Sequence, residues 1–138
     1  MISFEYLKQA HLIRTIAKIY FMKEQYKNII NEAYNGFNER NIAKVLSFMH
    51  SNVHWPNGWE GGYVEGHSGV SEYWTRQWKE INPSVKPVSM EENERGQIVV
   101  EVHQVAKDMQ GDVLFDGMVK HIYTIDDGLI KGMEIEKP

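Results

Sequence analysis

The sequence predicts an α+β fold in which N-terminal helices pack on a curved, mostly antiparallel sheet. Two observations indicate this order. Up to residue 81, apolar residues recur every three to four positions in several segments, as they do on amphipathic helices. From residue 85 onward, β-branched residues alternate with polar ones, and the segments are joined by turn residues, of which Asp127-Gly128 is the strongest hairpin signal.

Composition limits the function classes. The 138 residues suffice for one domain with a core, and their net charge is −4. No basic run is interleaved with aromatic residues, so no nucleic-acid partner is expected. The chain has no cysteine, which excludes disulfides and thiolate chemistry. No segment approaches the roughly 20 apolar residues of a membrane span, so no membrane partner is expected.

The first 37 residues predict two helices. Apolar spacing indicates one helix over 4–20 and a better one over 26–37, separated by the polar Lys23-Glu24-Gln25. Residues 1–21 are interpreted as an N-terminal helical extension. The alternative is that the translation start has been misassigned upstream of a true start at Met22. Residues 22–138 then form the domain. His11, Arg14 and Lys18 interrupt the apolar run that a secretory signal needs, so the cytoplasm is the predicted location.

The middle of the chain predicts short elements around a loop. Asn41 is the expected N-cap of a short helix, and a strand is expected around 53–55. A loop with four glycines follows, from Pro56 to Gly66. Ser68 or Ser71 is expected to cap the next helix, which Pro83 closes before a strand over 85–91.

Two consecutive hairpins over 97–136 carry the main functional hypothesis. Side chains of a strand alternate between the two faces of a sheet. If both turns have two residues, Val100 lies opposite His121 in the first hairpin, and His121 lies opposite Glu134 in the second. Both polar residues then lie with Gln104 on an otherwise apolar face. Opposed Cβ atoms are about 5 Å apart, so imidazole and carboxylate could share a hydrogen bond and serve in acid/base catalysis. The alternatives are a structural pair, or a register slip that leaves Glu134 in solvent.

Further residues are candidates for substrate binding. The Trp55 indole could donate to a ligand carbonyl, Asn57 could orient a ligand oxygen, and Trp59 with Tyr63 could form a lid; each also fits an ordinary structural role. The histidines show no HxH or HExxH spacing, so no metal site is expected. The full substrate-binding set is Trp55, Asn57, Trp59, Tyr73, Trp74, Gln104 and Tyr123.

Four stretches together resemble the nuclear-transport-factor-2-like (NTF2-like, or cystatin-like) superfamily, and in particular its SnoaL-like, polyketide cyclase-like branch. They are YNGFNERN at 34–41, FMHSNVHW at 48–55, GHSGV at 66–70 and HIYTIDDGLI at 121–130. The resemblance covers about 22–136. It implies a cone with a pocket between helices and sheet, and it implies a homodimer, for which the outer sheet face with Met118 and Ile122 is the candidate surface.

The resemblance also bears on the chemistry. The acid/base aspartate of SnoaL-like polyketide cyclases stands at the spacing that His121 occupies here. In the similar ketosteroid isomerases, the base aspartate falls on Asn57 and the oxyanion tyrosine on Ala33, next to Tyr34. An amide accepts no proton at neutral pH, so isomerisation by that mechanism is not expected.

The function predicted from the sequence is acid/base catalysis without a cofactor. The enzyme would be a cyclase, dehydratase or isomerase acting through His121 and Glu134 on a small, mostly apolar metabolite. The alternative is a non-catalytic domain that binds a small ligand or another protein.

Overall fold

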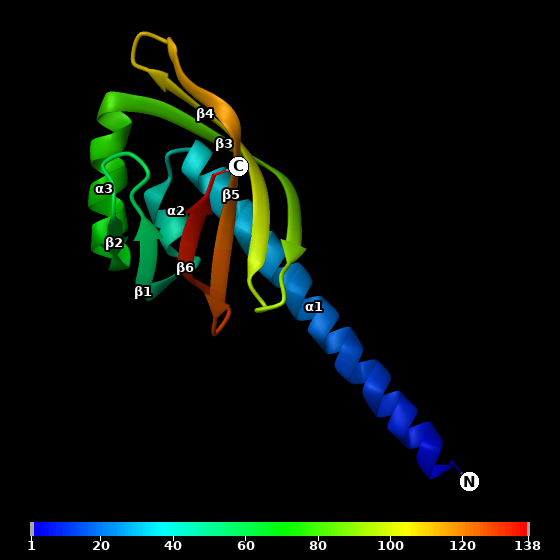
Figure 1. The fold of residues 1–138 in the computed structure, drawn as a ribbon. Helices are drawn as coiled ribbons and strands as arrows, with labels where there is room; N and C mark the ends of the chain where they lie inside the picture. Colours follow the sequence, from blue (N-terminus) through cyan, green and yellow to red (C-terminus); the bar gives the residue numbers. More distant parts are fainter. Residues whose placement is uncertain (1, 138) are drawn as a thin grey trace.

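The computed structural model describes residues 2–137 and confirms the α+β fold with a curved sheet (Figure 1). The sheet has six strands in the order β2-β1-β6-β5-β4-β3, and all neighbours are antiparallel except β1 and β6. The elements are α1 (Phe4–Asn38), α2 (Ile42–Leu46), β1 (Met49–Pro56), β2 (Tyr63–Glu65), α3 (Gly66–Glu80), β3 (Ile81–Glu92), β4 (Ile98–Asp108), β5 (Val113–Asp126) and β6 (Leu129–Glu136).

Helix α1 is continuous, so the prediction of two separate helices is wrong. The polar Lys23-Glu24-Gln25 does not end the helix, because these are good helix formers and no glycine or proline occurs before Gly36. Only the C-terminal part of α1 is buried, whereas its first half extends away from the sheet (Figure 1). The division of the chain at 21/22 stays a prediction. The large apolar residues exposed on this half are Phe4, Tyr6, Leu7, Leu12, Ile13, Ile16, Ile19, Tyr20, Phe21 and Met22.

Two of the predicted helix boundaries differ from the structure. Asn41 does cap α2, since its side chain accepts from the Lys44 N–H at 3.1 Å. Helix α3, however, begins at Gly66 with no side-chain cap, so neither expected serine serves. Pro83 lies inside β3 and does not close the helix; β3 is an edge strand, where the missing N–H of proline is tolerated.

The core lies between the sheet, α3 and the inner part of α1. Trp74 of α3 is almost completely buried and packs edge-on against Phe37 of α1 and Trp55 of β1, with ring centroids 5.3 and 5.8 Å apart. Aromatic pairs of this geometry add to the free energy gained by burial. Within residues 2–137, no helix combines the length and the apolar content that crossing a membrane requires.

Asn38 joins the end of α1 to the free edge of β3. Its amide donates to the Val85 carbonyl at 2.7 Å and accepts from the Val85 N–H at 3.0 Å. Asn38→Ala would leave both partly buried backbone groups without a protein partner, so we expect a loss of about 1 kcal/mol in the free energy of unfolding, measured by urea denaturation. Asn35→Ala is the matched control, because Asn35 lies exposed on the same helix and makes one long bond to Glu32. Equal losses in both variants would contradict this role of Asn38.

Candidate functional site

The first hairpin has the predicted register for a partly different reason. Val100 pairs with His121 and Val102 with Val119, as predicted. The connection, however, is a three-residue loop, because the Asp108 N–H bonds to the Asp112 carbonyl at 2.8 Å. Lys107 pairs with Val113 but Ala106 pairs with Phe115, so the pairing shifts by one residue at a bulge between them. This shift compensates for the longer loop, and the pairs beyond the bulge are the predicted ones.

The second hairpin corrects the predicted catalytic pair. The turn is as expected: Asp127 and Gly128 have φ angles of 55° and 74°, the conformation of a two-residue type I′ turn. A register shift follows, so that Thr124 pairs with Gly132, and the extra residue in β6 is Lys131. The predicted opposition of His121 and Glu134 is therefore wrong.

Glu134 lies on the other face of the sheet. It pairs with Ile122, and its carboxylate accepts from the Tyr63 hydroxyl at 2.5 Å. Tyr63 in turn stacks on His54, with centroids 4.2 Å apart. Tyr63 therefore lies away from the cavity and is not part of a lid.

The structure gives His121 a different partner, Tyr34 of α1. The Tyr34 hydroxyl lies 2.8 Å from Nδ1 of His121, and both side chains are buried. Tyr34 also lies edge-on to the buried Tyr123, with ring centroids 6.1 Å apart. Nε2 of His121 has no hydrogen-bond partner among residues 2–137, while the ring lines a cavity.

Burial keeps this cluster neutral. Desolvation lowers the pKa of His121 from its usual 6.5 to about 4. Burial also raises the pKa of Tyr34 and of Tyr123 above their usual value. For Tyr34, the neighbouring Tyr123 adds to the rise; for Tyr123, the hydrogen bond from Tyr34 lowers the pKa and offsets part of the rise. Two tautomers of neutral His121 fit the 2.8 Å contact. Either Nδ1–H donates to Tyr34 and Nε2 is an unprotonated acceptor, or the Tyr34 hydroxyl donates to Nδ1 and Nε2 carries the hydrogen.

The cavity has a volume of about 310 Å³ and lies between α1, α3 and the sheet. Its wall is mostly apolar and aromatic, which suits a small uncharged ligand. Asn57 and Glu134 are not part of the wall. Seven of the residues predicted from the sequence do line it: Trp55, Trp59, Tyr73, Trp74, Gln104, His121 and Tyr123.

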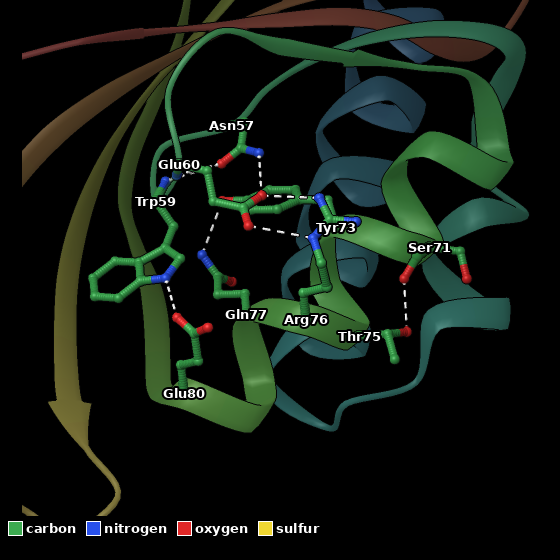
Figure 2. A network of polar contacts seen from close by, with 9 residues as sticks. All are labelled: Asn57, Trp59, Glu60, Ser71, Tyr73, Thr75, Arg76, Gln77 and Glu80. Carbon is green, nitrogen blue, oxygen red and sulfur yellow. Dashed lines mark hydrogen bonds and ion pairs between the residues drawn. The ribbon is translucent and has the colours of Figure 1, made fainter.

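The loop between β1 and β2 covers part of the cavity and is tied to α3 (Figure 2). The Asn57 amide organises this loop, since Oδ1 accepts from the N–H groups of Trp59 and Glu60 and Nδ2 donates to Glu60 at 2.9 Å. Glu60 pairs with Arg76 at 2.8 Å. The hydrogen bond from Arg76, followed by that from Asn57, lowers the pKa of Glu60 to about 2. The Trp59 indole donates to Glu80 at 2.8 Å.

Sequence reasoning missed Tyr34 and Gln77 as cavity residues. Tyr34 follows the helical spacing of the apolar residues in 26–37, a pattern that predicts packing and does not by itself indicate a site. A signal was available, because a tyrosine on a buried face needs a hydrogen-bond partner for its hydroxyl. Residues 2–137 contain no group of three acidic or histidine side chains arranged to hold a metal ion.

Comparison with known proteins agrees with this architecture. The family model for the SnoaL-like domain matches residues 30–133. Among curated proteins, none matches the chain significantly. TerC, crystallised with polyporic acid, is 26% identical with a TM-score of 0.72, over 83% of this chain and 92% of TerC.

Two further solved structures share the fold. An NTF2-like protein of unknown function from Burkholderia pseudomallei is 19% identical with a TM-score of 0.72, over 83% of this chain and 91% of that protein. The epoxide hydrolase/cyclase-like enzyme SalBIII, which has a role in pyran ring formation in the polyether salinomycin, is 15% identical. Its TM-score is 0.71, over 84% of this chain and 92% of SalBIII.

Proposed function

This chain belongs to the SnoaL-like domain family, and we propose that its cavity binds a small, uncharged, mostly apolar metabolite. We propose further that His121 transfers a proton to or from this metabolite. The observation that carries the proposal is the buried His121–Tyr34 pair in the wall of an apolar cavity. A cyclase, dehydratase or isomerase would use such a group. The cyclase-like enzyme SalBIII and the ligand-bound TerC support this reading by their structural likeness.

The proposal uses the tautomer of His121 in which Nδ1–H donates to Tyr34. Nε2 of His121 accepts a proton from a carbon next to the carbonyl group of the ligand. Tyr34 accepts from Nδ1–H, and so holds the ring and stabilises the imidazolium that forms. The Tyr123 hydroxyl, which burial keeps protonated, is the donor available to the carbonyl oxygen. A base with a pKa of about 4 is unprotonated at neutral pH and returns its proton readily.

A thermal-shift screen tests ligand binding. Neutral aromatic ketones, quinones and lactones should raise the melting temperature, since a ligand at 100 times its Kd stabilises by about 2.7 kcal/mol. Ala106→Leu should abolish the shift, because Ala106 is buried in the cavity wall and the larger side chain would occupy the space. The matched control is Val88→Leu, at an exposed site outside the wall. No shift with any compound, or equal shifts in both variants, would contradict a ligand-binding cavity.

Two expectations from the sequence stay predictions. One is the homodimer, for which the candidate surface includes Met118, which is exposed on the outer face of β5. The other is a cytoplasmic location.

A further inference from the structure

The cavity is closed at one end and open at the other. Along β5, the exposed fraction of the side chains that line it rises from 1% at Tyr123 and 6% at His121 to 43% at Phe115. Met133, which pairs with Tyr123 and also lines the cavity, is buried as well. The open end therefore lies where β4 ends and β5 begins, and a ligand that contacts His121 extends from there toward the β4–β5 hairpin.

The cavity is also long and narrow. His121 pairs with Val100 and Phe115 pairs with Ala106, so the two ends lie six residues apart on β5, which is about 20 Å at the rise of a β-strand. A volume of about 310 Å³ spread over that length gives a channel with the width of a single alkyl chain or a single ring. Its shape suits an elongated ligand.

The rim of the open end is apolar, although water reaches it. Leu114 and Phe115 line the cavity and are 52% and 43% exposed, and Trp59, from the loop between β1 and β2, is 43% exposed and lines it too. Val113 and Met109 continue the exposed apolar surface onto the tip of the hairpin, which projects beyond β3 (Figure 1). Large apolar side chains gathered at the mouth of a cavity indicate a surface that an apolar group covers.

The Phe115 ring forms part of the path from the mouth inward. A Cβ atom on Gly117 would lie 3.1 Å from Cζ of Phe115, so the ring lies back over the Gly117 backbone, where a side chain would displace it. The apolar wall that this ring provides thus begins four residues from His121, or about 13 Å away. Gln104 and Lys137 are the polar side chains of the sheet along this path, and both keep contact with water.

We infer that the cavity binds a carbonyl compound with a long, straight apolar tail. The carbonyl group lies against His121 at the closed end, and the tail runs along β5, passes over Phe115 and leaves the cavity at Leu114. The inference rests on the function proposed above, and it narrows the substrate class to compounds with the carbonyl group near one end of a chain that reaches the rim. Such a tail displaces water from the exposed rim, so each methylene that it buries there adds to the affinity.

Straight-chain methyl ketones test the shape of the ligand. The series runs from methyl propyl ketone to methyl undecyl ketone, with Kd measured by quenching of tryptophan fluorescence. Each added methylene should tighten binding about fourfold until the tail has passed Leu114. Dipentyl ketone, the isomer of methyl nonyl ketone with its carbonyl group in the middle, should bind about tenfold more weakly than that isomer, because the packed closed end has no room for a second tail beyond His121.

Variants locate the tail. Phe115→Ser and Leu114→Ser should each weaken the binding of methyl undecyl ketone about tenfold and leave the Kd of methyl propyl ketone within about twofold, because only the long tail reaches the rim. Both side chains are about half exposed, so the fold does not depend on them. Met118→Ser is the matched control, because Met118 is exposed on the outer face of the same strand and should change neither Kd.

Three results would overturn the inference while leaving the proposed function intact: an affinity that stops rising at methyl pentyl ketone, a dipentyl ketone as tight as methyl nonyl ketone, or rim variants that affect short and long ketones equally. Sedimentation of the same variants separates a further case. If they leave every Kd unchanged but convert a dimer into a monomer, a second copy of the chain covers the rim and the inference is wrong. Failure of every ketone to bind would count against both the inference and the proposed function.

Discussion

His121→Gln is expected to slow proton exchange on a bound ketone by about 10²–10⁴-fold, the usual contribution of a positioned acid/base group. Glutamine resembles histidine in size but accepts no proton at neutral pH. The measurement is the incorporation of deuterium next to the carbonyl group, followed by NMR in D₂O with a ketone that stabilises the protein. The rate constant per bound ligand should fall, whereas ligand affinity changes much less.

Two controls isolate the role of His121. His103→Gln changes a histidine on the outer face, where it is bonded to Asp116, and should leave the exchange rate unchanged. Tyr34→Phe keeps the base but removes the partner of Nδ1, so an intermediate loss is expected. The exchange rate should stay level from about pH 8 to about pH 5 and fall near pH 4, where His121 becomes protonated. Exchange within tenfold of wild type in His121→Gln would refute the assignment, and ligand binding without exchange would favour a non-catalytic binding domain.

Acidification is expected to destabilise the protein through the same histidine. The folded-state pKa of about 4 lies below the 6.5 of an unfolded chain, so the unfolded state binds the proton first. The contribution of His121 to stability is therefore fully present above about pH 6.5 and is lost as the pH falls toward 4. A difference of 2.5 pKa units corresponds to about 3 kcal/mol.

Urea denaturation between pH 7 and pH 4 measures this loss. Other groups titrate in the same range, so the informative quantity is the difference between wild type and His121→Gln, whose free energy of unfolding should depend less on pH. His103→Gln, which removes an exposed histidine, should follow the wild-type profile. Parallel profiles for wild type and His121→Gln would show that His121 is not held neutral by burial.

The architecture was predictable because it depends on patterns that span many residues. The alternation of β4 and β5 allows one register with an apolar inner face, and that register is present although the connecting loop has three residues. Periodicity also indicated helices before a mostly antiparallel sheet, although α1 is one helix where two were expected and β2 lies in the expected loop. The family model and the solved structures agree with this part of the prediction.

The site was less predictable, because it depends on single residues. One extra residue, Lys131, separated Glu134 from His121, and no local sequence signal marks such a bulge. The true partner, Tyr34, is 87 positions away in the sequence and lies on the apolar face of a helix, where the pattern predicts packing. Contacts at that separation depend on how α1 crosses the sheet, which periodicity does not specify.

The bulge at Lys131 determines which side chains of β6 face the cavity. With it, Met133 and Ile135 contribute to the cavity wall, and Glu134 points to the opposite face. Deleting Lys131 would turn each later side chain of β6 to the opposite face of the sheet. The Glu134 carboxylate would then lie against His121, and Met133 and Ile135 would leave the cavity wall. A single insertion or deletion at this position thus separates a neutral cavity from a charged one, and family members could move between these two chemistries without any substitution in the strand.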